Sequence, residues 1–130
     1  MGHDHSGMEL ALFSKEVNFC LPNLVSPTMI CETVKGFLMD LCRDLKGERC
    51  KLIGHIKVLL NMRAAGYLFL SATSFDQVPY CKGRLEKDTS EMTIAINAIV
   101  YGFKQDLLEQ LVSRKLQDLS QRFHAVMVRH

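Results

Sequence analysis

The segment from Met92 to Tyr101 constrains the fold more than any other part of this chain. Its alternate residues form an unbroken apolar row, consisting of Met92, Ile94, Ile96, Ala98 and Val100. The residues between them mix polar and apolar types: Thr93, Ala95, Asn97, Ile99 and Tyr101. Because successive side chains on a strand point to opposite faces, the pattern predicts a β-strand with one buried face and one semi-polar face.

Two other segments alternate in the same way and are rich in β-branched or aromatic residues. In residues 51–60, one face would carry Leu52, Ile56, Val58 and Leu60, and the other Ile53, His55, Lys57 and Leu59. In residues 66–73, Leu68, Leu70 and Ala72 would oppose Tyr67, Phe69, Ser71 and Thr73. Gly66 can adopt a positive φ, so we expect a short hairpin loop to join these two strands at that residue.

Further strands are expected on either side of this meander. Alternating apolar residues near the start of the segment from Met8 to Phe19 predict an N-terminal strand. It should end at Pro22, because the residue before a proline is restricted and the proline lacks a hydrogen-bond donor. A strand from Tyr80 to Glu86 would shorten an otherwise long unstructured connection.

Two segments show the spacing of three and four residues that is typical of an amphipathic helix. The first begins at Ser26 and Pro27, which suit the N-cap and the first helical position, and Gly47 is expected at C′. Its apolar stripe consists of Ile30, Val34, Phe37, Leu38, Leu41 and Leu45. The second runs from Phe103 to about His124, roughly 30 Å at 1.5 Å per residue. Its last two turns should therefore extend past a small sheet and expose apolar side chains.

Together these segments predict an α+β fold. We expect an antiparallel meander sheet of three to five strands with two helices on one face, in the order β-α-β-β-(β)-β-α. A chain of 130 residues has the length of one domain. We therefore expect residues 1–7 to form a disordered polar leader and residues 8–130 to form a single α+β domain.

The composition excludes several classes of protein. Charged residues of both signs are interspersed along the chain, the net charge is +2, and no basic cluster marks a nucleic-acid site. The apolar runs are too short to cross a bilayer and the N-terminus lacks a signal-peptide pattern, so a cytoplasmic location is expected. Phosphate-binding glycine loops, nucleophile elbows and zinc-protease motifs are absent from the sequence. No cofactor is predicted, and no motif identifies a family.

Five cysteines raise the question of a metal site or a disulfide framework. No two of them have the separation of two to four residues that a zinc site or a redox dithiol uses. Cys31 and Cys42 would lie about 16 Å apart on one helix, which is too far for a disulfide. We therefore expect reduced, structural cysteines. Cys50 and Cys81 flank the meander and could approach each other.

The first seven residues leave three interpretations open. They suit a mobile leader with no role in the fold. The free amine and His3 could instead chelate Cu(II) or Ni(II), with His5 as a further candidate ligand, although no other metal site is predicted. Gly2 followed by Ser6 also matches the pattern for N-myristoylation.

The semi-polar face of the predicted sheet holds the residues with chemical potential. The candidates for a ligand site or an interface are His55, Lys57, Tyr67, Phe69, Thr93, Asn97 and Ile99. His55 could act as a general acid or base near neutral pH, oriented by Asn97 or a hydroxyl. Asp76 follows the second strand of the meander and could approach His55. An ordinary half-exposed sheet face has a similar mixture of residues, so the pattern alone does not establish a site.

Three functions fit this face, and a homo-oligomeric binding module is favoured. Two helices cannot cover both sides of the sheet, so a partner subunit in a symmetric dimer, or a small ligand, would cover the other side. The second is a small enzyme or ligand pocket with His55 as acid or base, which is disfavoured because no catalytic grouping is evident. The third is an RNA-binding module, which the balanced charge disfavours. Its residues would be Lys57, Lys82, Arg84 and Lys87, with Tyr67 and Phe69 as stacking platforms.

Overall fold

The computed structural model describes residues 8–128, and the side chains of residues 8–125. The elements in chain order are β1 (Leu10–Val25), α1 (Pro27–Gly47), β2 (Leu52–Asn61), the 3-10 helix η1 (Arg63–Ala65), β3 (Gly66–Ala72), β4 (Tyr80–Leu85), β5 (Thr89–Tyr101), α2 (Gln105–Arg122) and β6 (Val126–Val128). This order confirms the predicted α+β class with an antiparallel sheet and two helices. The expected leader, residues 1–7, lies outside the described residues.

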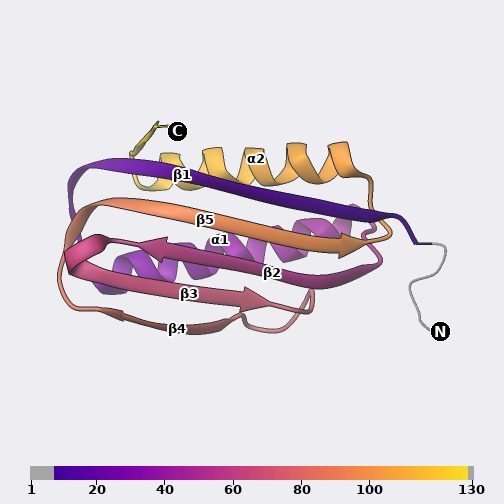
Figure 1. Ribbon diagram of the computed structural model, residues 1–130, viewed down its shortest axis with the longest axis horizontal. Coiled ribbons are helices and arrows are strands. Elements are labelled where there is room, and N and C mark those ends of the chain that lie inside the picture. The colour runs from indigo at the N-terminus through magenta and orange to yellow at the C-terminus, as the bar shows by residue number, and fades with distance from the viewer. Residues whose placement is uncertain (1–7, 129–130) are drawn as a thin grey trace.

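β5 lies inside a single antiparallel sheet with the strand order β4-β3-β2-β5-β1-β6. β2, β3 and β4 follow one another as a meander, whereas β5 returns past β3 and β2 and pairs with β2 on one side and β1 on the other. Figure 1 shows β5 between these two strands. The three-residue strand β6, which the sequence patterns do not predict, pairs with β1 at the edge of the sheet.

Both helices cover the same face of the sheet, and Figure 1 shows them behind the strands. The apolar row predicted for β5 faces these helices and is buried. The largest fully buried side chains of this core are Phe19, Ile30, Leu38, Leu41, Leu45, Ile56, Leu60, Leu70, Ile94, Ile96, Leu108 and Leu119. No helix in the described part of the chain is long and apolar enough to pass through a bilayer.

β1 is longer than the N-terminal strand predicted from the sequence. It continues through Pro22 to Val25, so the predicted end at the proline is wrong. Pairing with β5 is regular from Leu10 to Cys20, and the register then shifts before Val25 pairs with Thr89. Pro22 falls within that irregular stretch, where the regular ladder does not require the N–H that proline lacks.

A β-bulge at Gly54 reverses part of the predicted face assignment in β2. The register with β5 shifts between Ile53 and His55, so one extra residue changes the phase of the alternation. Ile53 turns into the core and is 3% exposed, whereas Leu52 turns outward and is 37% exposed. The prediction that Leu52 is buried and Ile53 faces outward is therefore wrong. His55 and the residues after it face as predicted.

α1 begins where the sequence predicts but ends differently. The hydroxyl oxygen of Ser26 accepts a hydrogen bond from the N–H of Met29, as expected of an N-cap. Gly47, predicted at C′, is the last helical residue, and Arg49 adopts the left-handed conformation with φ at 70°. The N–H of Cys50 then bonds to the carbonyl five residues before it, which is the pairing of a Schellman motif.

α2 does not extend past the sheet. Leu119 in its last turn is buried, and Phe123, which follows the helix, is also buried. The ring of Phe123 packs edge-on against Phe19 of β1, with centroids 6.5 Å apart. The predicted apolar overhang is therefore wrong, because the 16 residues of β1 make a sheet long enough to cover the whole helix.

Gln105, the first residue of α2, occupies part of the edge of β1. Its side-chain Nε2 donates a hydrogen bond to the carbonyl of Leu12 at 2.6 Å. Its Oε1 accepts one from the N–H of Leu12 at 2.9 Å. The side-chain amide thus supplies the donor and acceptor that a neighbouring strand would otherwise supply. β6 pairs with the same edge further along, at Asn18 to Cys20.

Gly66 should tolerate no side chain, whereas Gly47 should accept one. Gly66 has φ at 125°, and an added Cβ would lie 1.8 Å from the carbonyl oxygen of Arg84. We expect Gly66→Ala to lower the free energy of unfolding by about 2–4 kcal/mol, because both the backbone and β4 must shift. Gly47 has no atom within 4 Å of such a Cβ. Gly47→Ala should therefore raise stability by about 0.5–1 kcal/mol. Urea titration of both variants measures the difference, and equal effects would contradict the hairpin geometry.

Candidate binding surface on the outer face of the sheet

The outer face of the sheet is defined here by the side chains of β1, β5, β2, β3 and β4 that point away from the helices. Paired residues place its members in four rows that cross the sheet. The rows are Leu12–Ile99–His55; Ser14–Asn97–Lys57–Ser71–Tyr80; Glu16–Ala95–Leu59–Phe69–Lys82; and Asn18–Thr93–Asn61–Tyr67–Arg84. All seven candidate residues from the sequence lie on this face.

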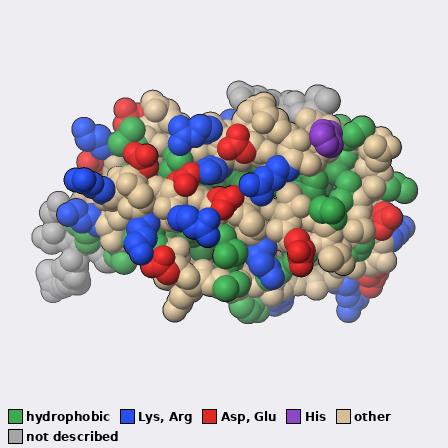
Figure 2. All heavy atoms as spheres, turned by 180° about the vertical axis from the view of Figure 1, so that it is seen from behind, with side chains coloured by type: hydrophobic (Ala, Val, Ile, Leu, Met, Phe, Trp, Pro, Cys, Tyr) green, Lys and Arg blue, Asp and Glu red, His purple; other side chains and the backbone are tan. Residues whose placement is uncertain are grey.

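Large apolar side chains on the outer face are only partly covered. Leu12 of β1 is 50% exposed, Leu59 of β2 is 44% exposed and Tyr67 of β3 is 43% exposed. Leu10 and Leu52, the first residues of β1 and β2, extend the apolar area at one end of the sheet. The helical side carries instead a mixture of interspersed acidic and basic side chains, which Figure 2 shows. The outer face therefore has the apolar surface that a partner or ligand would cover.

A shallow depression lies near the middle of this face, over β1, β5 and β2. Its volume is about 540 Å³, and its lining includes Leu12, Ser14, His55, Lys57, Asn97 and Ile99. Lys57 supplies a cationic side chain and His55 an imidazole, while Ser14 and Asn97 supply polar groups without charge. A depression of this composition suits a small ligand with an anionic or hydrogen-bonding group.

Within the described residues, His55 has no carboxylate partner. Asp76, which the sequence placed within possible reach of His55, instead forms an ion pair with Lys46 of α1 at 2.9 Å. Among residues 8–125, no carboxylate lies within ion-pair distance of the imidazole. An acid–base role for His55 would therefore depend on Ser14 and Asn97, the uncharged polar residues that line the same depression.

Thr93 is already engaged within the protein. Its hydroxyl donates a hydrogen bond to Oδ1 of Asn18 on β1 at 2.7 Å. This bond joins β5 to β1 at the register position where the two residues pair. Of the seven candidates, Thr93 is therefore the one whose polar group contributes to the architecture of the face.

Sequence reasoning missed the contribution of β1 to this face. The outward residues of β1 pair with outward residues of β5 and extend the face by one strand: Leu10, Leu12, Ser14, Glu16 and Asn18. The buried face of β1 alternates through Ala11, Val17, Phe19 and Leu21, and Lys15 interrupts this signal in the sequence. The glycine at position 54 was the available signal for the bulge that brings Leu52 to the same face.

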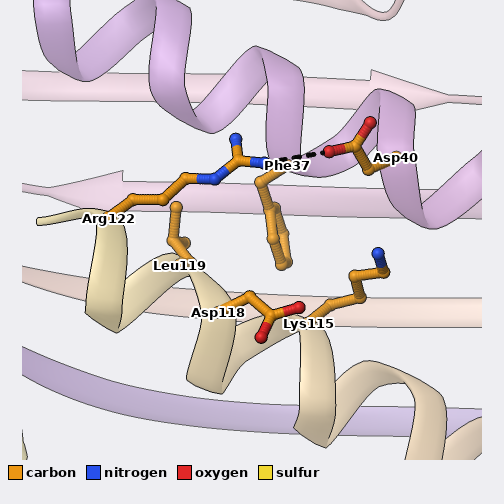
Figure 3. A pocket seen from close by; sticks show the side chains of 6 residues that line it. All are labelled: Phe37, Asp40, Lys115, Asp118, Leu119 and Arg122. Carbon is orange, nitrogen blue, oxygen red and sulfur yellow. Dashed lines mark hydrogen bonds and ion pairs between the residues drawn. The ribbon is translucent and has the colours of Figure 1, made fainter.

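A second hollow, between α1 and α2, is too small to be a site. Figure 3 shows it lined by Phe37, Asp40, Lys115, Asp118, Leu119 and Arg122. Its volume of about 20 Å³ has room for roughly one water molecule. Asp40 pairs with Arg122 at 3.2 Å, and Lys115 pairs with Asp44 of α1 at 2.6 Å. These contacts join the two helices, which accounts for the hollow without a ligand.

Neither a metal site nor a comparison with known proteins identifies a function for this face. The described residues contain no group of three or more His, Cys, Asp or Glu side chains placed to hold a metal ion. The candidate ligands His3 and His5 lie outside the described residues. No family model matches the chain, and comparisons with curated proteins and with solved structures find no match.

The hydrogen bond between Thr93 and Asn18 should show a measurable coupling energy. We expect Thr93→Val to lower stability by about 1 kcal/mol, because it leaves a part-buried amide oxygen with one donor fewer. Thr93→Ser keeps the hydroxyl and is the matched control. A double-mutant cycle with Asn18→Ala, followed by urea denaturation, measures the coupling. A coupling energy near zero would contradict a structural role for this pair.

Proposed function

We propose that this protein is a homodimeric binding module whose two copies pack outer face to outer face, with a small anionic ligand held in the depression near His55. The observation that carries the proposal is the incomplete coverage of the apolar outer face. Exposed leucines and a tyrosine are distributed over several rows of this face. Both helices occupy the opposite side of the sheet. A second copy would remove this surface from water.

The outer face has the size that a stable dimer needs. Five strands spaced about 4.8 Å apart, with side chains at either margin, make a face roughly 24 Å wide. The rows from Leu10 to Asn18 extend it over roughly 30 Å at 3.3 Å per residue. The product is about 700 Å², close to the approximately 800 Å² per partner of a standard protein interface.

The charges at the margins of the face are complementary across a two-fold axis. Glu16 lies on β1 and Lys82 on β4, in the same row but at opposite ends of it. Within one chain they are about 19 Å apart, which is beyond effective attraction in salt. A two-fold axis along β2 would place Glu16 of each copy opposite Lys82 of the other. The apolar Leu59 would then lie near the axis.

The same axis gives the depression a role. The axis would bring Lys57 of one copy toward Lys57 of the other at the centre of the interface. Like charges facing one another in this way oppose association. A bound anion would offset that repulsion, and Asn97 and Ser14 offer hydrogen-bonding groups beside it. Ligand binding and dimer formation would then favour each other.

An aspartate at the centre of the face should dissociate the dimer. Leu59→Asp puts a charge on each copy near the axis, so we expect the dissociation constant to rise roughly 100-fold or more. Leu107→Asp on α2 is the control, because Leu107 is 40% exposed against 44% for Leu59 but lies away from the face. Light scattering across a concentration series gives both constants. A wild-type chain that is still monomeric at the highest concentration of the series would overturn the proposal.

A charge exchange tests the predicted axis itself. We expect Glu16→Lys and Lys82→Glu each to weaken the dimer by about tenfold, because each creates two like-charged pairs. The double variant restores opposite charges and should recover most of the wild-type affinity. Sedimentation at low and high salt measures the three constants. If the double variant is weaker than either single variant, the two copies do not pack about this axis.

A second function is supported by one specific observation. The aromatic residues Tyr67 and Phe69 on β3 pair directly with Arg84 and Lys82 on β4, which places stacking and cationic groups side by side. Such a surface suits a single-stranded nucleic acid. Fluorescence anisotropy with a labelled oligouridine tests it. If the protein is monomeric and its binding weakens steeply with salt, nucleic-acid binding replaces the dimer proposal. If no binding occurs at low salt, nucleic-acid binding is excluded.

A further inference from the structure

Two of the five cysteines lie against each other, although they are 50 residues apart in the chain. The Sγ atoms of Cys31 on α1 and Cys81 on β4 are 3.9 Å apart. Both side chains are partly exposed, and both are free thiols in this structure. The sequence suggested a possible approach of Cys81 to Cys50, which is wrong. The thiol of Cys50 instead contacts the backbone carbonyls of Leu52 and Tyr101.

Small molecules can reach the Cys31–Cys81 pair from solvent on its Cys31 side. An open hollow of about 290 Å³ lies beside it, between the start of α1 and the strands β3 and β4. Its lining includes Cys31 and Glu32 of α1 and Gly83 of β4. β4 pairs only with β3 among the described strands and has mostly exposed side chains, so the edge that carries Cys81 is able to adjust.

The other cysteines do not share this environment. Cys42 is 2% exposed, and burial raises its pKa to about 11, which makes it a poor nucleophile at neutral pH. Burial likewise raises the pKa of Cys50. Cys20 is exposed, but the structure places no second thiol beside it within the described residues. Only Cys31 and Cys81 combine contact between thiols with access.

We propose that Cys31 and Cys81 are a redox-active pair that forms a reversible disulfide by exchange with small-molecule disulfides such as oxidised glutathione. One thiol loses its proton, and its sulfur attacks the small disulfide, so that a mixed disulfide forms and one small thiol leaves. The second cysteine then attacks the protein sulfur of the mixed disulfide, which forms the Cys31–Cys81 bond and releases the second small thiol. The two protein thiols are oxidised by two electrons, and the small disulfide is reduced to two thiols.

The bond would join the first turns of α1 to the edge strand of the sheet. The sulfur atoms must close from 3.9 Å to about 2.05 Å, and the two side chains must rotate toward each other to do so. A cross-link that closes a loop of this length restricts the unfolded chain. The oxidised form should therefore unfold at a higher temperature. The inference does not depend on dimer formation.

Reaction should become faster as the pH rises. Burial raises the pKa of Cys81, the neighbouring Cys31 raises it further, and the positive charge of Lys35 acts in the opposite direction. At Cys81 the thiolate is therefore a minor species at neutral pH, and its fraction rises about tenfold per pH unit below the pKa. We expect the initial rate of oxidation to rise by about that factor between pH 7 and pH 8.

The experiment uses the full chain with Cys20→Ser, which removes the exposed competing thiol. After incubation with oxidised glutathione, titration in denaturant should find two thiols in place of four, and peptide mass spectrometry should find Cys31 linked to Cys81. The oxidised protein should melt several degrees higher than the reduced protein, and its melting temperature should fall back to the reduced value after treatment with dithiothreitol. The matched control carries Cys42→Ser in addition to Cys20→Ser, and it should still form the Cys31–Cys81 disulfide.

The single variants test which atoms react. Cys31→Ser and Cys81→Ser should each stop at a stable glutathione adduct on the remaining cysteine, because the resolving thiol is gone. Four thiols remaining after incubation at pH 8 would overturn the proposal. A stable glutathione adduct on the protein with both cysteines present, or a bond between any other pair, would overturn it equally.

Discussion

The burial of one side of β5 is the constraint on which the structure depends. The apolar row that includes Met92, Ile94 and Ile96 must be shielded from water along the length of β5, and both helices shield it from the same side. β5 is paired on both edges, so its backbone is satisfied by β1 and β2. Cover on one side of the sheet leaves the other side in contact with solvent. The architecture that stabilises the chain therefore also determines where a binding surface can be.

Much of this fold was predictable because local patterns and global packing agree. The start of α1, the alternation in β5 and the hairpin at Gly66 each follow from residues close together in sequence. The errors occur where a tertiary contact outweighs a local preference. Arg49 accepts a left-handed backbone that a glycine would occupy more easily, and Pro22 continues a strand because pairing there is irregular.

The candidate surface was predictable in part for the same reason. Alternation places His55, Lys57 and Asn97 on one face regardless of strand order. Which residues stand opposite them depends on pairing between distant strands, and periodicity within one segment carries no information on this. The return of β5 to a position beside β1 therefore could not be derived, nor could the contact of Cys31 with Cys81. Both arise from long-range topology.

The edge contacts of β1 have a consequence for the growth of the sheet. A sheet can elongate without limit only if strands can be added at both of its edges, since each added copy must offer a fresh edge to the next. Gln105 and β6 obstruct the β1 edge at two separate points, while β4 remains at the other margin. A side-chain amide thus takes the place of a neighbouring strand at Leu12, and it leaves fewer free backbone groups on β1 for a strand from another chain.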